Sequence, residues 1–141
     1  MIAFSFSGIV NSETGWEYSQ STFQAFYMLE SAQIDDLEVE SSDVIAAFKG
    51  DLCLGWVYAD PEGYTTIPVM GDDGSDYSEG YLAAGEIPDI VIYDSTYGSI
   101  LEISPSSSLP GWSNNEIFII EGTSSANNTF GCTESDACNY N

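Results

Sequence analysis

Apolar and polar positions alternate with a period of two along much of this chain, and the clearest example is residues 43–66. Two apolar runs flank a Lys-Gly-Asp turn at residues 49–51, where glycine supplies the positive φ that a tight hairpin turn requires. One face of the second run carries large apolar side chains: Leu52, Leu54, Trp56 and Tyr58. The opposite face is also largely apolar, so the pattern predicts a central hairpin that is covered on both sides.

Shorter runs of the same kind recur along the rest of the chain, separated by turns rich in Gly, Pro, Asp and Ser. Alternation and aromatic density over residues 23–29 favour a strand, with a helix as the alternative. Residues 16–18 suit either a loop or an edge strand, and the polar residues 34–40 suit a connection or an exposed edge. Besides the central hairpin, the predicted strands are residues 2–10, 23–29, 67–70, 89–94, 100–103 and 117–120. The turn at residues 95–99 joins strands 89–94 and 100–103 into a predicted second hairpin.

Many short strands without a convincing amphipathic helix are typical of an all-β fold. We predict an antiparallel β-sandwich, of the jelly-roll or immunoglobulin-like kind, followed by a short tail that contains cysteines. The 141 residues are enough for one domain with a substantial core. The composition predicts that the β-sandwich domain occupies residues 1–121, a polar linker residues 122–130 and the tail residues 131–141.

The charge balance excludes some classes of partner. The chain contains 23 acidic residues and one lysine, with no arginine or histidine, and its formal net charge is −22. Contacts to phosphate need Lys or Arg, and Lys49 is the single such residue, so we predict no binding to nucleic acid. No stretch approaches the roughly 18 apolar residues of a membrane span, so we predict no membrane insertion. Adaptation to salty water is the simplest explanation of the acidity.

Four carboxylates within one Gly-rich loop, residues 71–80, raise the alternative of a metal site. They are Asp72, Asp73, Asp76 and Glu79. Proteins bind Ca²⁺ through oxygens of carboxylates and backbone carbonyls on flexible loops, so the residue types fit. The spacing differs from that of an EF-hand loop, which leaves a solvated acidic loop and a Ca²⁺ site both open.

Catalysis is the least favoured function for this composition. Without histidine the chain lacks the commonest general base and the Ser-His and Cys-His nucleophile pairs. A glycosidase that uses two carboxylates remains formally possible, but among 23 acidic residues the spacing singles out no pair. We therefore predict that the protein is not an enzyme.

Four aromatic residues are candidates for a binding surface: Trp16, Tyr18, Tyr77 and Trp112. Sugar C–H faces pack on aromatic rings, so such residues could form a platform for a glycan. In β proteins they more often fill the core or an edge. Both interpretations stay open, most of all for the tryptophans, which occur in loop contexts.

The three cysteines fall into two groups. Cys53 lies in the middle of a predicted strand and is expected to be a buried thiol. Cys132 and Cys138 lie in the polar tail and could close a small disulfide loop, which would indicate an oxidising exterior.

The tail carries the most specific motif of the chain. Residues 131–141 read Gly-Cys-Thr-Glu-Ser-Asp-Ala-Cys-Asn-Tyr-Asn. This segment resembles the opening of the GCTDPxACNYN repeat found in large surface and secreted proteins of marine bacteria and in structural proteins of marine tailed phages. In that family the repeat continues through a third cysteine and an acidic cluster. This chain stops before that part, so metal binding by the tail is not carried over.

The body resembles a module that accompanies such repeats. The matching pieces are Trp-x-Tyr at residues 16–18, Asp-x-Ile-Ala-Ala-Phe-x-Gly-Asp-x-Cys-x-Gly at 43–55, and Ile-Val-Ile-Tyr-Asp at 90–94. In those proteins the module is a β-sandwich at the outer surface, in adhesins and in virion appendages or decorations. The resemblance brings no catalytic residues with it.

Together these features predict a structural or interaction protein on the surface of a marine phage virion, as capsid decoration or as part of a tail or fibre. Its partners would be other copies of itself and other structural proteins of the virion or surface, with host glycans as a further candidate. The first residues lack the basic and long apolar regions of a secretory signal, which favours release by lysis. The alternative is a secreted bacterial adhesion or carbohydrate-binding module at the cell surface.

Overall fold

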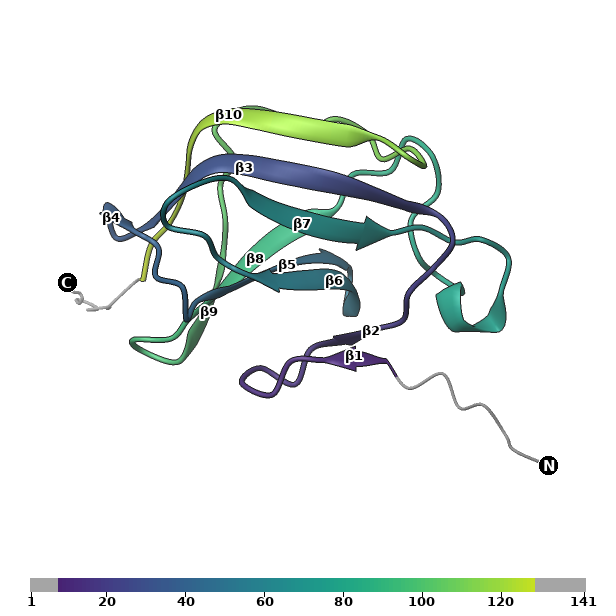
Figure 1. The fold of residues 1–141 in the computed structure, drawn as a ribbon, viewed down its shortest axis with the longest axis horizontal. Helices are drawn as coiled ribbons and strands as arrows, with labels where there is room; N and C mark the ends of the chain where they lie inside the picture. The colour runs from purple at the N-terminus through teal and green to yellow at the C-terminus, as the bar shows by residue number, and fades with distance from the viewer. Residues whose placement is uncertain (1–7, 129–141) are drawn as a thin grey trace, which may run out of the picture.

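The computed structural model describes residues 8–128, and within them the fold is all-β, as the sequence predicts. The one helical element of these residues is a 3-10 turn, η1 (Asp76–Ser78), and none of their helices is long and apolar enough to span a membrane. The strands are β1 (Ile9–Val10), β2 (Glu17–Tyr18), β3 (Gln24–Ile34), β4 (Leu37–Glu38), β5 (Val44–Lys49), β6 (Leu52–Tyr58), β7 (Thr65–Met70), β8 (Asp89–Asp94), β9 (Ser99–Glu102) and β10 (Ile117–Ala126). Figure 1 shows β10, β3 and β7 above β5, β6 and β8, with the β1–β2 hairpin below them.

One four-stranded antiparallel sheet, in the order β6-β5-β8-β9, contains both predicted hairpins. The central hairpin is confirmed: β5 and β6 pair around Gly50, which has a φ of 60°. The second hairpin is also confirmed, because β8 pairs with β9 from Val91↔Glu102 to Asp94↔Ser99. Residues 44–47 of β5 are fully buried, because the core lies against one face of this strand and the β1–β2 hairpin packs on the other, and this explains why both faces are apolar.

The other large sheet is built around β3, the longest strand, with β7 and β4 along one side and β10 along the other. A two-residue turn with positive φ at Asp35 (53°) and Asp36 (68°) joins β3 to β4, and Asp accepts this conformation more readily than most residues. Strand β10 runs parallel to β3, with Ile117 opposite Phe26. The expectation of purely antiparallel pairing is wrong for this pair.

Strand β10 is longer than its apolar run. The sequence predicts a strand over residues 117–120 and a linker from residue 122, yet β10 continues to Ala126. Gly122, with a φ of 92°, lies in the register shift between Ile120 and Thr123, so the chain passes the irregularity and resumes pairing with β3. Residues 122–126 are therefore paired strand rather than linker. The predicted tail, with Cys132 and Cys138, lies outside the described residues.

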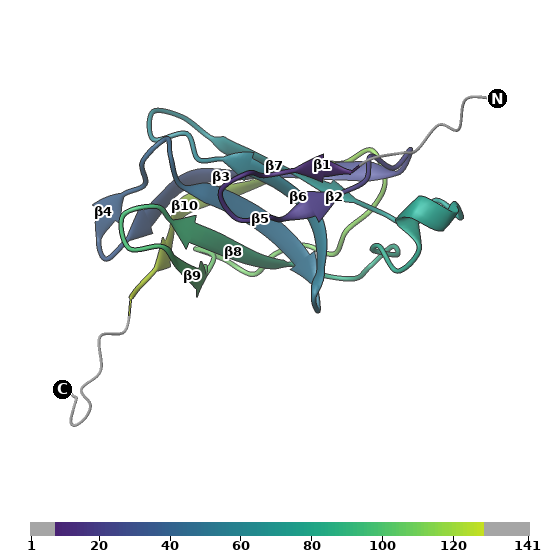
Figure 2. The same cartoon turned by 90° about the horizontal axis from the view of Figure 1, so that it is seen from below.

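The β1–β2 hairpin covers one face of the β5–β6 pair. The indole of Trp16 packs edge-on against Phe48 with ring centroids 5.5 Å apart, and Tyr18 packs edge-on against Trp56 at 6.5 Å. The Trp56 indole N–H also donates to the carbonyl of Ile9 at 3.0 Å. Residues 16–18 therefore belong to a short separate hairpin that docks through aromatic contacts. Figure 2 shows the ribbon of this hairpin in front of β5 and β6.

The main core contains fully buried side chains from both large sheets. The sheet around β3 contributes Tyr27, Leu29, Ile67 and Val69, and the sheet around β5 contributes Ile45, Leu54, Ile90 and Ile92. On β3, β7 and β8 these residues occur at every second position, as expected for strands that turn one face to the core. The core thus leaves the opposite face of the β3 sheet available to solvent or to partners.

Candidate functional site

The acidic loop, residues 71–80, is organised by the carboxylate of Asp73. One of its oxygens accepts hydrogen bonds from the Ser78 hydroxyl at 2.7 Å and from the Ser75 N–H at 2.9 Å. The other accepts from the N–H (2.9 Å) and the hydroxyl (2.8 Å) of Thr22. Hydrogen bonds from the Ser75 side chain, the Thr22 N–H and the Ser78 side chain lower the pKa of Asp73 well below its usual value. The loop is therefore tied to the segment just before β3.

The four carboxylates of this loop do not gather into a metal site. Asp73 is taken up by the hydrogen bonds above, and Asp72 accepts a local hydrogen bond from the Gly74 N–H at 2.9 Å. Asp76 and Glu79 are exposed at the two ends of η1. Within residues 8–128, no group of three or more His, Cys, Asp or Glu side chains is placed to hold a metal ion. Of the two alternatives for this loop, the geometry supports a solvated, hydrogen-bonded acidic loop over a Ca²⁺ site.

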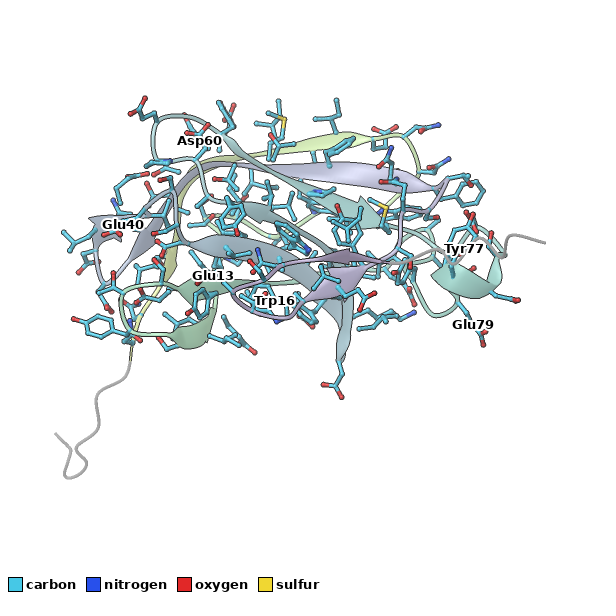
Figure 3. All side chains as sticks on the ribbon, turned by 60° about the horizontal axis from the view of Figure 1, so that its bottom comes forward. Glu13, Trp16, Glu40, Asp60, Tyr77 and Glu79 are labelled. Atoms are coloured by element: carbon cyan, nitrogen blue, oxygen red, sulfur yellow. The ribbon has the colours of Figure 1, made fainter. Side chains whose placement is uncertain are left out.

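The four candidate aromatic residues do not share one surface. Tyr18 and Trp112 are buried, with exposed fractions of 8% and 3%. The Trp112 indole N–H donates to the carbonyl of Val69 at 2.9 Å, and its ring occupies the space that a side chain at Gly71 would need. Trp16 is half-buried within the β1–β2 hairpin, whereas Tyr77 lies in η1, in a different part of the molecule (Figure 3). Tyr18 and Trp112 are thus core residues, and a four-residue platform is not formed.

Trp16 lines a shallow groove of about 280 Å³ on the outer side of the β5–β8–β9 sheet. The apolar part of the groove lining consists of Phe48, Val91 and Ile100, and carboxylates flank these residues. The acidic residues that line the groove are Asp51, Asp89 and Glu102. An aromatic ring next to exposed carboxylates can pack against a sugar face and accept hydrogen bonds from its hydroxyls.

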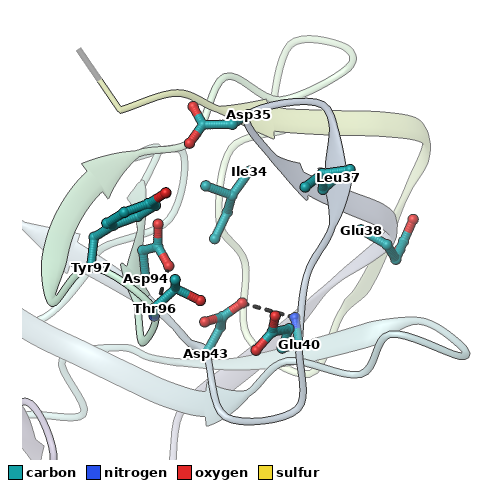
Figure 4. A pocket seen from close by; sticks show the side chains of 9 residues that line it. All are labelled: Ile34, Asp35, Leu37, Glu38, Glu40, Asp43, Asp94, Thr96 and Tyr97. Carbon is teal, nitrogen blue, oxygen red and sulfur yellow. Dashed lines mark hydrogen bonds between the residues drawn. The ribbon is translucent and has the colours of Figure 1, made fainter. Parts of the chain in front are cut away.

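An acidic cavity of about 220 Å³ lies between the β3–β4 turn and the β8–β9 turn (Figure 4). Its most buried carboxylate, Asp43, accepts hydrogen bonds from the Ser95 N–H (2.9 Å), the Ser95 hydroxyl (2.7 Å) and the Glu40 N–H (2.8 Å). The side-chain amide of Asn128 donates to Asp35 and to Asp94, at 2.9 Å each. These carboxylates therefore join loops from distant parts of the chain, and they act as structural acceptors.

A contiguous apolar patch lies on the outer face of the β3 sheet. Ile117 and Ile119 of β10 are 61% and 56% exposed, and they lie opposite the half-buried Phe26 and Met28 of β3. Side chains at this spacing share one face, so the four residues, here called the outer patch, form two adjacent apolar rows. The outer patch is not predictable from the sequence, because an unbroken apolar run does not reveal which of its faces is covered.

Strand β10 is also an open edge over part of its length. The Ser104–Ser106 segment covers its second half, through hydrogen bonds between the Ser104 and Ser125 backbones at 2.7 and 3.0 Å. No strand in the described part of the chain pairs with the free side of residues 117–120. Exposed acidic residues, Glu116 and Glu121, flank this open stretch.

The geometry thus defines an acidic all-β domain with an exposed apolar sheet edge, an aromatic groove and a carboxylate-lined cavity. Comparisons with models of protein families, with curated proteins and with solved structures found no match to this chain. What the chain contacts must therefore be inferred from the chemistry of these surfaces.

Proposed function

We propose that this chain is a non-enzymatic structural and interaction protein on the outside of a marine tailed phage, as capsid decoration or as part of a tail or fibre. The observation that carries the proposal is the outer patch, where two isoleucines are more than half exposed at an open sheet edge. Contiguous apolar surface at an unpaired edge marks contact sites in soluble proteins. The tail motif at residues 131–141, with its resemblance to phage and bacterial surface repeats, supports the same role.

The finer fold that we propose is an antiparallel β-sandwich of the jelly-roll or immunoglobulin-like kind. Support comes from the core that the β3 and β5 sheets share, and from the close approach of β6 and β7 at one side of it. The parallel β3–β10 pair is the departure from a simple antiparallel sandwich. Such a module presents loops and edges to partners.

The charge distribution suits an outward-facing position. At a formal net charge of −22, the protein is repelled by packaged DNA and by other anionic polymers. The most buried carboxylates, Asp43 and Asp94, accept hydrogen bonds from neighbouring loops and so stabilise the fold. This favours a role through contact, without chemistry.

The test is electron microscopy of purified particles from the native source, with the density traced for this chain. We expect repeated copies on a capsid, tail or filament, with the outer patch or the Trp16 groove against a neighbour. Detection only in soluble cell extract, and never in purified particles or on surfaces, would overturn the proposal. Peptide mapping of the purified particles gives an independent count of copies.

The second candidate is a secreted bacterial adhesion or carbohydrate-binding module, and the Trp16 groove favours it. Its aromatic ring and three flanking carboxylates are suited to a glycan. A glycan screen, with and without Ca²⁺, should then show binding that Trp16→Ala and Glu102→Gln each abolish. Tyr64→Ala is the control, because Tyr64 is exposed but does not line the groove. Glycan binding that both groove variants retain would exclude this site.

A further inference from the structure

We propose that residues 1–7 of one copy add as an extra strand to the open edge of β10 in another copy. This inference rests on the proposed contact function and names the partner of the outer patch as a second copy of this chain. Strand addition to an exposed edge supplies affinity through backbone hydrogen bonds and specificity through alternate side chains. The edge, the facing side chains and the charges each support it.

The backbone of β10 is oriented to accept a strand. The Phe26 N–H donates to the Glu116 carbonyl at 3.0 Å, which fixes which residues of β10 face β3. Because hydrogen-bonding direction alternates along a strand, the N–H and C=O groups of Ile117 and Ile119 face the open side. The Ser104–Ser106 segment limits the acceptor to this part of β10, so the site suits one short strand.

The side chains of residues 1–7 match the acceptor at the same period of two. Ile2, Phe4 and Phe6 alternate with small residues, and this pattern predicts a strand with one apolar face. Next to β10, that face would extend the exposed rows of Ile117 and Ile119. The small side chains would lie on the opposite face, beside Phe118, where a large side chain would meet the edge of the core.

Among the apolar runs of the chain, the charges around the open edge of β10 favour residues 1–7 as the added strand. The acceptor is flanked by the exposed carboxylates of Glu116 and Glu121, so a strand with acidic side chains would be repelled. Residues 1–12 contain no charged side chain. The other long alternating runs, in β3, β5, β6 and β8, already hold places inside the two large sheets.

The placement of the two elements predicts how copies would join. Strand β1, which directly follows the donor segment in the sequence, lies on the opposite face of the molecule from β10 (Figure 1). Donor and acceptor are therefore different surfaces, and the contact is heterologous. A heterologous contact generates rows or rings of copies, in contrast to the closed pair that an edge-to-itself contact would form.

Sedimentation velocity of the full chain tests the proposal. We expect concentration-dependent species above the monomer, which Phe4→Asp/Phe6→Asp (donor lost) and Ile119→Asp (acceptor lost) each abolish. Ile87→Asp is the matched control, because Ile87 is 60% exposed, close to the 56% of Ile119. The Ile87→Asp chain should associate like the unmodified chain. Ile117→Pro is a second acceptor variant that removes an N–H facing the open side. Circular dichroism and urea unfolding verify that each variant is folded.

Mixing the two defective chains gives the sharpest result. The donor-lost chain retains its edge and the acceptor-lost chain retains residues 1–7, so an equimolar mixture should form a one-to-one complex and nothing larger. If the mixture stays monomeric, or if the donor-lost chain associates like the unmodified one, the proposal is wrong. Association that depends on β10 but is indifferent to residues 4 and 6 would indicate edge-to-edge pairing instead and would equally overturn it.

Salt distinguishes a second copy from a basic partner. Each copy carries a formal charge of −22, so association should strengthen as NaCl rises from about 0.01 M to about 0.5 M and the Debye length falls from about 30 Å to a few Å. A basic partner would bind more weakly over the same range. A chain that stays monomeric at high salt and high concentration contradicts this inference, even where microscopy finds it on particles. Association of a chain that is absent from particles contradicts only the proposed function.

Discussion

The α-carbon of Gly55 in β6 faces the carbonyl oxygen of Pro68 in β7 so closely that a methyl group at position 55 would overlap that oxygen. Backbone from the two large sheets thus meets without intervening side chains at this position. Gly55→Ala should therefore lower the free energy of unfolding by about 1–3 kcal/mol, since the backbone must move apart to admit the methyl group. Urea unfolding followed by tryptophan fluorescence measures the loss.

Gly63→Ala is the matched control for that substitution. The nearest atom to a methyl group at Gly63 is a carboxylate oxygen of Asp60 at 3.4 Å, which is an ordinary contact. Its effect should stay within about 0.5 kcal/mol. Equal losses for the two variants would show that the close approach of β6 and β7 is unimportant for stability.

Asp43 is the carboxylate whose loss should destabilise the fold most through hydrogen bonding. It is 2% exposed, and it accepts bonds from the Ser95 N–H and hydroxyl and from the Glu40 N–H. Asp43→Asn places an NH₂ group against one of these donors, so we expect a loss of about 1–3 kcal/mol in unfolding free energy. Asp36→Asn is the control, because Asp36 is exposed and Asn also accepts its positive φ. A smaller loss for Asp43→Asn than for this control would contradict the prediction.

The hairpins were predictable because they are local. Alternating apolar positions around Gly50 specify both the turn and the two strands, and β5 and β6 pair as expected. The parallel pairing of β10 with β3 joins residues far apart in the sequence, and no local pattern specifies it. The same pairing holds residues 122–126 in a strand, although their composition is typical of a linker. Long-range pairing here overrides local preference.

The candidate sites were predictable only as residue types. Trp112 occurs in a loop context, but Gly71 leaves room for its indole, and the ring is buried. Asp73 was expected as a possible metal ligand, whereas nearby hydroxyl and N–H groups saturate it. The outer patch was missed because Ile117 and Ile119 alternate with Phe118 and Ile120, so exposure depends on which face the core covers.

Cys53 should be protected from alkylation in the folded protein. Burial raises the pKa of its thiol to about 11, and a backbone hydrogen bond from Gly55 opposes this only in part. At pH 8 the thiolate is then on the order of a thousandth of all Cys53 side chains. The residue is also only 5% exposed, which limits access of the reagent to the sulfur. Iodoacetamide at pH 8 should label Cys53 slowly in buffer and rapidly in guanidinium chloride, as measured by peptide-resolved mass spectrometry. Equal labelling rates in the two conditions would contradict the burial.

The Asp73 carboxyl should make stability depend on pH in a defined direction. Its pKa is lowered in the folded state, so its contribution is fully present above the unfolded pKa, near 3.9, and is lost as pH falls toward the folded value. Asp73→Asn should therefore lower Tm at pH 7, and the difference from the unmodified chain should shrink at pH 3.

The difference between the two chains is the informative quantity in that experiment. At a formal net charge of −22, protonation of many carboxylates also relieves repulsion within the protein, so the absolute Tm of either chain mixes two opposing effects. Asp76→Asn removes the same charge from the same loop, and it controls for the change in net charge. If Asp73→Asn and Asp76→Asn shift Tm alike, or if the Asp73→Asn difference is unchanged between pH 7 and pH 3, the hydrogen bonds from Ser75, Thr22 and Ser78 do not stabilise the ionised carboxylate as the structure indicates.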